Sequence, residues 1–330
     1  EKITFSDIIR GEISFESDLL GDFSIAKRQD VPLYNFAVVV DDEEMKITHI
    51  IRGEDHIPNT PKQLLLIEAL GFKRPEYAHL PLILGTDRSK LSKRHGATSV
   101  GEYREQGYLS ETLLNFIALL GWNPGNNKEI FAKEEIIKEF SLKKVQKSCA
   151  IFDITKLDWM NGEYIRKKSM DELTKLCLPF LEKAGLVKST KHRTQTEYIK
   201  KIVALEQPRL KKLLEIGERT DYFFHPPQYA KELLRWKTMN NDEVLASLDI
   251  SIKILQSPLL KSYFNKENLE KVFLAEIGEG DRGKILWPLR VALTGKKASP
   301  GPFEIMEILG ADEILKRLKR AQEILRDHTT

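Results

Sequence analysis

The stretch KLSKR, residues 90–94, places Lys90 and Lys93 around Ser92, and a histidine follows it. A lysine ammonium is a mobile point charge with several N–H donors, which suits the oxygens of a phosphate group. A loop with two such side chains could close on a triphosphate and stabilise the negative charge that develops during attack at phosphorus. On its own, a short basic run is more often a solvated surface loop. The elements around the loop must decide between these interpretations.

The residues before this loop predict an α/β unit. The β-branched run NFAVVVDD predicts a buried strand over residues 35–42, with Asp41 and Asp42 forming a turn at its end rather than a metal pair. The segment KITHIIRGEDH, residues 46–56, predicts a second strand that runs into a polar loop. A further strand is predicted over residues 79–85, and it leads into KLSKR. Ligands in such sheets bind beyond the carboxyl ends of the strands, where IIRGEDH is expected to lie.

Two helices are predicted within the same region. Thr60 suits an N-cap, Pro61 suits the first helical position and Gly71 suits the C′ position, so a helix is predicted between them. Another helix is predicted over residues 110–122, with Gly121 at its end.

The second half of the chain predicts helices alone. Helical spacing occurs around residues 156–165, and after residue 168 apolar residues recur at that spacing in four long segments. These segments are residues 170–186, 197–218, 241–256 and 311–328. The predicted fold class is therefore α/β, followed by an all-α domain.

The composition is that of a soluble globular protein with about two domains. The chain has 330 residues, of which 41% are hydrophobic and 31% are charged, and its net charge is only +3. Such a balance does not indicate a nucleic-acid binder, so any such surface must come from local patches. Cys149 and Cys177 form no CxxC pair, which excludes a Cys-rich zinc site and a disulfide framework and suits the cytoplasm. No apolar run reaches about 18 residues, so no membrane span is expected.

Several segments together resemble one known family. The stretches PLYNFAVVVDD, ITHIIRGEDHIPNTPKQLLLIEALG, YAHLPLILG and KLSKR resemble bacterial-type glutamyl-tRNA synthetases of class I. GYLSETLLNFIALLGW, FDITKLDWMN and PLRVALTG resemble the same family in the same order, so the resemblance covers nearly the whole chain. It implies ATP and substrate-bound Mg²⁺, the substrates L-glutamate and tRNA-Glu, no metal held by the protein itself, and a cytoplasmic monomer. The implied fold is the second half of a class I Rossmann-like catalytic domain with a helical anticodon-binding domain.

The resemblance assigns the nucleotide site to two segments. Lys93 matches the second lysine of the signature loop, which contacts ATP phosphates and stabilises the transition state of adenylate formation, and Lys90 matches the first. Ser92 lies between them and is expected to contact ATP. Asp55 and His56 resemble positions near the nucleotide and the acceptor end, with hydrogen bonding within a loop as the alternative.

Two further residues match the amino-acid pocket. Tyr34 matches a tyrosine that lines this pocket, and a core aromatic at a strand edge is its alternative. Arg52 matches an arginine that pairs with a substrate carboxylate. A planar guanidinium can hold a carboxylate through two parallel hydrogen bonds. A salt bridge to a local acid is the alternative for Arg52, whereas His79, beside an apolar strand, is expected to be a packing residue.

Basic stretches supply candidate contacts to tRNA. Lys143, Lys144 and Lys147 lie in one such stretch and Arg209 lies in another, and each could contact phosphate. A solvated helix face is the alternative for both. The resemblance divides the chain into the end of the catalytic domain (residues 1–78), a segment with the signature loop and tRNA stem contacts (79–165) and the anticodon-binding domain (166–330).

One signature of class I synthetases is missing. Their H-I-G-H motif has two histidines three positions apart, and no two of the seven histidines here have that spacing. The motif, the first strand and another glutamate-binding arginine are expected before residue 1, so the chain by itself is expected to be inactive. A non-catalytic tRNA-binding protein derived from a synthetase is the alternative function. The helical second half disfavours a glutaminyl-tRNA synthetase, whose anticodon region is built of β-barrels, and a glutamyl-queuosine synthetase, which has no anticodon domain.

Overall fold

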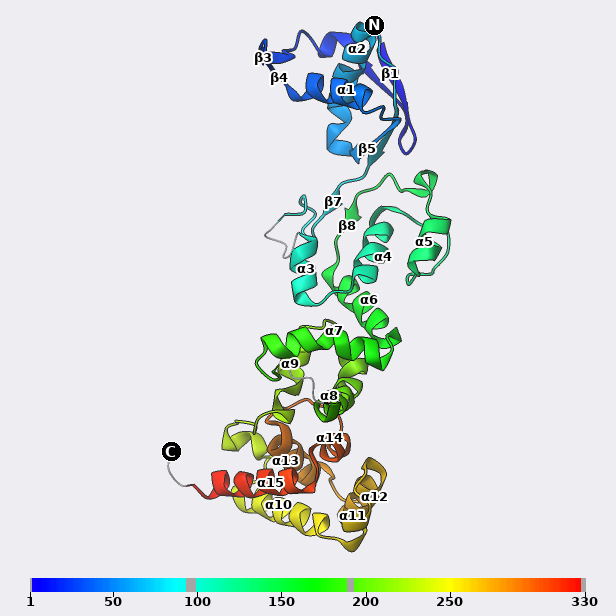
Figure 1. Cartoon of the computed structure of the whole chain (residues 1–330). Coiled ribbons are helices and arrows are strands. Elements are labelled where there is room, and N and C mark those ends of the chain that lie inside the picture. The colour runs from blue at the N-terminus through cyan, green and yellow to red at the C-terminus, as the bar shows by residue number, and fades with distance from the viewer. Residues whose placement is uncertain (1, 93–98, 189–192, 328–330) are drawn as a thin grey trace. The chain divides into compact units, whose positions relative to one another are not determined.

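The computed structural model describes residues 2–92, 99–188 and 193–327 and divides the chain into two compact units (Figure 1). The first unit is Glu1–Asn161 and the second is Gly162–Thr330. Every strand of the described residues lies in the first unit, and the described residues that follow it form helices and connecting segments. The predicted order, α/β and then all-α, is confirmed.

The first unit alternates short strands and helices. Its strands are β1 (Lys2–Asp7), β2 (Gly11–Glu16), β3 (Ala26–Arg28), β4 (Val31–Pro32), β5 (His49–Gly53), β6 (Glu76–Leu80), β7 (Ile83–Leu84) and β8 (Ala150–Ile151). Its α-helices are α1 (Tyr34–Glu44), α2 (Thr60–Leu70), α3 (Val100–Gln106), α4 (Ser110–Gly121) and α5 (Lys133–Glu139). Its 3-10 helices are η1 (Ser17–Leu19), η2 (Glu54–Asn59) and η4 (Leu142–Lys144), and α6 (Ile154–Lys167) crosses the boundary between the units.

The main sheet has the order β2-β1-β6-β5. β1 and β2 form an antiparallel hairpin, whereas β6 runs parallel to both β1 and β5. In the register of β5 and β6, Arg52 is the partner of His79. Partners on adjacent parallel strands project on the same face of a sheet, so the register alone brings these two side chains together.

The predicted strand over residues 35–42 is wrong, because these residues lie within the helix α1. Val39 is buried, and Phe36 packs in the same cluster against residues of α2. The i, i+3 spacing of these two residues is helical, and packing against α2 overrides the strand preference of the β-branched run. Asp41 and Asp42 consequently lie in the last turns of a helix and do not form a turn at a strand end.

The segment from β5 to β6 forms a parallel β-α-β unit, and two predicted details change there. The strand ends at Gly53, and the expected polar loop is the 3-10 helix η2. Gly71 ends α2 in the left-handed conformation (φ 71°), as predicted. Thr60, however, is the first residue of α2 rather than its N-cap, which is Asn59. The Thr60 side chain is fully buried and forms hydrogen bonds with the site described below.

The single strand predicted over residues 79–85 is two strands, β6 and β7, in different sheets. Pro81 has no N–H for a strand ladder, and the N–H of Leu82 donates to the Glu54 carboxylate (3.0 Å). β7 then pairs in parallel with β8, and Ile83 is the partner of Ala150, which lies 67 positions later in the chain. The predicted helices over residues 110–122 and 156–165 correspond to α4 and α6 and are confirmed.

The second unit is a bundle of helices. Its α-helices are α7 (Met170–Lys183), α8 (Arg193–Glu206), α9 (Glu215–Thr220), α10 (Asn241–Leu255), α11 (Pro258–Ser262), α12 (Lys266–Ile277), α13 (Gly283–Thr294), α14 (Pro302–Leu309) and α15 (Ala311–Arg326). Its 3-10 helices are η5 (Gln207–Arg209), η6 (Asp221–Phe223) and η7 (Lys231–Leu234). A large apolar core joins α10, α12, α13, α14 and α15, with fully buried residues that include Leu248, Phe273, Leu289, Ile305 and Leu318.

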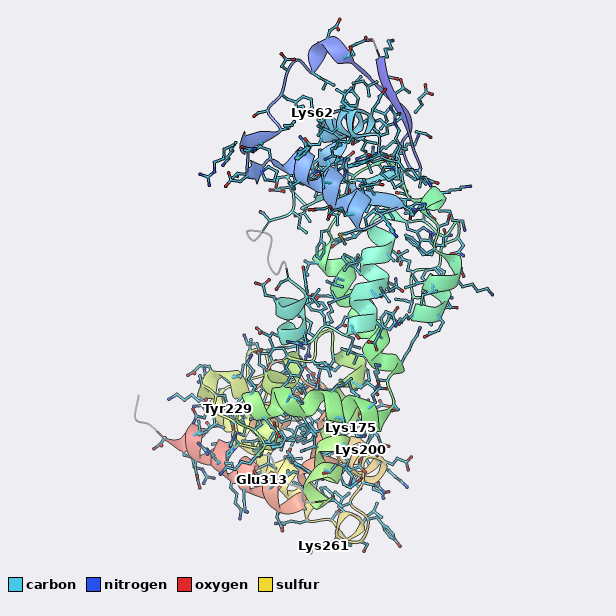
Figure 2. All side chains as sticks on the ribbon, turned by 45° about the horizontal axis from the view of Figure 1, so that its top comes forward. Lys62, Lys175, Lys200, Tyr229, Lys261 and Glu313 are labelled. Atoms are coloured by element: carbon cyan, nitrogen blue, oxygen red, sulfur yellow. The ribbon has the colours of Figure 1, made fainter. Side chains whose placement is uncertain are left out.

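Helices α7 and α8 pack side by side in this unit, and Figure 2 labels a lysine on each of them, Lys175 and Lys200. The ammonium of Lys200 pairs with Asp171 of α7 at 2.6 Å. Because this pair is exposed, it is worth little free energy, and the buried side chains of α7, such as Leu173 and Leu181, carry the packing.

Candidate functional site

Arg52, at the end of β5, is held by neutral hydrogen-bond acceptors. Its Nε donates to Nε2 of His79 (3.2 Å), and its Nη2 donates to the hydroxyl of Thr60 (2.8 Å). The guanidinium carbon also lies 5.9 Å from the ring centroid of Tyr77. Among the described residues, no carboxylate lies within salt-bridge distance of Arg52, so the alternative of a salt bridge to a local acid is wrong there. The cation therefore keeps N–H donors for an anion from outside.

His79 is fully buried, as expected for a packing residue, but both of its ring nitrogens also have polar partners. Its Nδ1 lies 2.6 Å from Oδ2 of Asp7, a carboxylate that is also buried. The backbone N–H of His79 donates to the same carboxylate (3.0 Å), as do the N–H groups of Ile9 and Arg10. Burial lowers the pKa of His79, and the hydrogen bond that its ring donates to Asp7 opposes that shift without cancelling it. A guanidinium only donates hydrogen bonds, so Nε2 of His79, which faces Nε of Arg52, must carry a lone pair; this geometry favours a neutral imidazole with its proton on Nδ1.

Tyr34 and His56 form the next part of the site. The Tyr34 hydroxyl and Nδ1 of His56 are 3.3 Å apart, and the ring centroids are 5.7 Å apart. Tyr34 is the first residue of α1 and is 50% exposed, so the alternative of a core aromatic is wrong. His56 lies on η2, and its backbone oxygen accepts a hydrogen bond from Thr60 (3.3 Å). Thr60 therefore links the His56 segment to Arg52.

The basic loop begins with an ion pair to η2. The ammonium of Lys90 donates to Asp55 (3.0 Å), and this hydrogen bond lowers the pKa of the Asp55 carboxyl. A tight turn precedes the pair, because the N–H of Gly85 donates to the carbonyl of Ser89 (2.8 Å). Ser92 follows as an exposed residue. Lys93, the lysine assigned the main catalytic role, lies outside the described residues.

Glu54 and Arg10 brace the same end of the sheet, although sequence reasoning selected neither of them. Nη2 of Arg10 lies 2.5 Å from Oε2 of Glu54, and both side chains are mostly buried. Nε of Arg10 donates to the backbone oxygen of His79 (3.3 Å). Asp7 was missed as well. The available signal was the position of Asp7 within the apolar run ITFSDII, since an acid in a buried strand needs a partner.

The candidate tRNA contacts lie on exposed or half-buried segments. Lys143, Lys144 and Lys147 are exposed around η4, where Lys144 donates to the carbonyl of Pro124 (3.2 Å) and Lys147 donates to the carbonyl of Arg10 (3.1 Å). Each ammonium has further donors, so these bonds leave it able to contact phosphate.

Arg209, in the second unit, lies 3.5 Å from the buried carboxylate of Glu206. It lines a cavity of about 340 Å³ together with seven other residues, namely Glu206, Glu215, Glu218, Arg219, Lys296, Ala298 and Ser299. Burial raises the pKa of Glu206, and the nearby Arg209 and Arg219 only partly offset this effect.

In the part of the chain that the structure describes, no group of three or more His, Cys, Asp or Glu side chains could hold a metal ion. No helix there is long and apolar enough to cross a membrane.

Comparison with known proteins matches both units. Residues 1–159 match the profile of the catalytic domain of class I tRNA synthetases (E and Q), and residues 172–322 match an anticodon-binding domain. The chain is 45% identical to glutamate–tRNA ligase 1 of Caldicellulosiruptor saccharolyticus, with 96% of this chain and 65% of that protein covered. It is 43% identical to the glutamate–tRNA ligase of Moorella thermoacetica, with 98% and 66% covered. The chain thus spans slightly less than two thirds of the length of these relatives.

A solved structure shows the same fold. The crystal structure of a glutamate–tRNA ligase from Elizabethkingia meningosepticum, in complex with its amino acid, superposes with a TM-score of 0.82 at 34% identity. The superposition covers 99% of this chain and 67% of that one. The two matched domains, the relatives and the shared fold together place this chain in the glutamate–tRNA ligase family, with a class I catalytic domain and a helical anticodon-binding domain.

Proposed function

We propose that the protein activates L-glutamate with ATP and transfers it to tRNA-Glu. The single observation that carries this proposal is Arg52, a half-buried cation that is held by neutral acceptors and has no carboxylate within salt-bridge distance among the described residues. A site of this kind accepts a substrate carboxylate. The relatives described above are named glutamate–tRNA ligases, and the solved structure of one such ligase is a complex with its amino acid.

The proposed chemistry has two steps. In the first, a carboxylate oxygen of glutamate attacks the α-phosphorus of ATP, a bond forms between them, and the bond to the departing pyrophosphate breaks. In the second, a ribose hydroxyl at the end of the tRNA attacks the acyl carbon, and AMP leaves. Mg²⁺, bound with the ATP phosphates, would neutralise charge during the first step.

The chain's own residues take separate roles in this scheme. Arg52 binds a glutamate carboxylate, and Tyr34 lines the same pocket. Lys90 and Lys93 bind the ATP phosphates, and Lys93 also stabilises the charge that develops during attack. In the described structure the ammonium of Lys90 pairs with Asp55, and the pair is exposed (67% and 41%). An exposed pair is worth at most about 1 kcal/mol, so a polyphosphate can displace Asp55 at low cost.

Ser92, Asp55 and His56 complete the proposed ATP site. Ser92 is the exposed residue that precedes Lys93, and its hydroxyl is suited to a phosphate oxygen. Asp55 and His56 lie on η2. The Asp55 carboxylate can accept hydrogen bonds from the nucleotide, and the His56 ring can accept or donate them.

We further propose that Lys143, Lys144, Lys147 and Arg209 contact the tRNA backbone. Arg209 falls within the part of the chain that matches an anticodon-binding domain, and the cavity that it lines also contains Arg219 and Lys296, alongside three glutamates. Phosphate contacts of this kind weaken as salt rises, because bound counterions are released on binding.

The test of function is pyrophosphate exchange into ATP, measured on the product of the complete gene with L-glutamate, L-glutamine and L-aspartate in turn. Exchange is expected with L-glutamate alone, followed by acylation of tRNA-Glu. Exchange that does not depend on glutamate would refute the proposal. Absent exchange with salt-sensitive tRNA binding would instead favour a non-catalytic tRNA-binding protein.

The tRNA contacts are tested by measuring the affinity for tRNA over a range of salt concentrations. Each lysine-to-alanine change at the three η4-region positions should reduce the slope of log affinity against log salt by about 1. Lys261→Ala, at an exposed lysine on α11 (Figure 2), is the matched control and should leave the slope unchanged. Equal slopes in all variants and the wild type would show that these lysines do not contact the tRNA.

A further inference from the structure

Arg52 depends on a buried chain of hydrogen bonds that starts on another strand. Asp7 on β1 accepts a hydrogen bond from the Nδ1–H of His79 on β6 (2.6 Å), and Nε2 of His79 accepts a hydrogen bond from the Nε–H of Arg52 on β5 (3.2 Å). Asp7 and His79 are separated by 72 positions in the sequence. Both are only 0–2% exposed, so neither can bind a substrate directly.

The direction of each bond follows from the donors that are available. A guanidinium only donates hydrogen bonds, so the atom facing Nε of Arg52 must carry a lone pair. Nε2 of His79 has that lone pair only when the imidazole is neutral and its proton lies on Nδ1. Asp7 selects this tautomer, because its carboxylate accepts from Nδ1 and is itself held by three backbone N–H groups.

Thr60 completes the support of the guanidinium. Its hydroxyl accepts from Nη2 of Arg52 (2.8 Å) and donates either to the carbonyl of His56 (3.3 Å) or to Nε2 of His79 (3.2 Å). Two acceptors at Nε and Nη2 fix the plane of the guanidinium. Its remaining N–H groups have no acceptor among the described residues.

We propose that Asp7 and His79 are positioning residues that orient Arg52 for the glutamate carboxylate and thereby set selectivity for that substrate. The proposal rests on the proposed function for the identity of the substrate. A guanidinium that is already held in one plane presents parallel N–H donors whose geometry matches a carboxylate. A freely rotating guanidinium must first be ordered, and the entropy lost in that step weakens the binding of the carboxylate.

The imidazole of His79 must be neutral to accept the hydrogen bond from Arg52. The charged and titratable groups that face it come from four strands or helices, and they are Asp7 and Arg10 from β1 and its turn, Arg52 from β5, His56 from η2 and Tyr77 from β6. Burial and the cation of Arg52 disfavour an imidazolium, and Asp7 favours one, so protonation would place two cations in contact and break the bond from Nε.

The first test needs no enzymatic activity and uses the 330-residue chain. Long-range proton–nitrogen spectra of histidine-labelled protein should show His79 with a protonated Nδ1 and a bare Nε2 between about pH 6 and pH 8. The Nε–H of Arg52, assigned with Arg52→Lys, should exchange slowly with water in the wild type and faster in His79→Asn. A protonated Nε2 at pH 7, or an unchanged exchange rate, would overturn the proposal.

The second test separates positioning from stability in the product of the complete gene. In His79→Asn the amide can still donate to Asp7 but ends short of Arg52, whereas in His79→Gln the amide oxygen can reach the place of Nε2. His79→Asn is expected to raise the KM for glutamate about tenfold, with the KM for ATP within about twofold of wild type, because one hydrogen bond to a charged group is lost. His79→Gln should lie closer to the wild type.

Phe5→Leu is the matched control. Phe5 is buried and packs near the rings of Tyr77 and His79 (centroids 5.6 and 6.1 Å apart), so this change lowers thermal stability without removing a bond to Arg52. It should leave both KM values unchanged. If the two His79 variants lose glutamate affinity equally, or if the loss in all three variants follows their melting temperatures, the residues are merely structural. If the wild type shows no glutamate-dependent exchange, the proposed function fails and the role in substrate selection fails with it, while the spectra still decide the hydrogen-bond network.

Discussion

Replacing Arg52 should impair the use of glutamate far more than the use of ATP. Its guanidinium is held through Nε and Nη2, and its remaining N–H groups are available for a carboxylate. Each hydrogen bond between charged groups contributes about 1.5–3 kcal/mol, and the half-buried setting favours the lower part of that range. Two such bonds give about 3–4 kcal/mol, which corresponds to a loss of about 10²–10³-fold in kcat/KM for glutamate in Arg52→Ala.

Arg52→Lys refines this prediction. Lysine keeps the charge but lacks the planar fork of two parallel N–H donors, and it cannot form the same hydrogen bonds to His79 and Thr60. The kcat/KM for glutamate should therefore still be about 10–100-fold below the wild type in Arg52→Lys. The assay is glutamate-dependent pyrophosphate exchange, with glutamate and ATP varied separately. Arg74→Ala is the control, because Arg74 is an exposed arginine in the loop before β6 whose acid partner, Glu68, is 3.4 Å away. A higher KM for ATP with an unchanged KM for glutamate would refute the assignment of Arg52.

Three further predictions concern other parts of the chain. Lys93→Ala should lower the rate of adenylate formation by about 10²–10³-fold and weaken ATP binding much less, and unchanged pyrophosphate exchange would make KLSKR a solvated loop. Burial raises the pKa of Cys177 to about 12, whereas Cys149 is exposed. A thiol reagent at pH 8 should therefore modify only Cys149 in the native chain and both cysteines after unfolding. Rapid modification of both cysteines in the native chain would contradict the burial of Cys177. The folded-state pKa of Glu206 is raised above its unfolded value, so the contribution of Glu206 to stability falls as pH rises from about 4.5 through the folded pKa. Over that range Glu206→Gln should gain stability relative to the wild type, as measured by urea unfolding. A stability difference between the two proteins that shrinks as pH rises would contradict this prediction.

Local patterns in the sequence were sufficient for the helical half of the fold. Residues such as Leu173, Cys177 and Leu181 recur at helical spacing, and the structure buries each of them completely. Spacing of this kind is a property of a short segment, so it survives without knowledge of the partner helix. The α/β class was likewise predictable, because strands and capped helices alternate along the first part of the chain.

The prediction failed where packing opposed local preference. The run of valines in α1 favours a strand by itself, but Phe36 and Val39 pack against α2 and make the segment a helix. Threonine is a residue type that often forms an N-cap, yet the Thr60 hydroxyl forms hydrogen bonds with Arg52 and His79 instead. In both cases a contact from outside the segment outweighs a local preference worth at most about 2 kcal/mol.

For the site, motif resemblance selected Arg52, Tyr34, Lys90 and Asp55 as individual residues, and only the tertiary structure decided their partners. The pairing of Lys90 with Asp55 joins residues 35 positions apart. The chain from Asp7 through His79 to Arg52 crosses three strands and depends on the register of β5 with β6 and on the parallel pairing of β1 with β6. Register is set by the burial of whole strand faces, so no single segment encodes it. The sequence alone therefore determined which residue types were available for chemistry, while the pairing of the strands determined which of them are held in place.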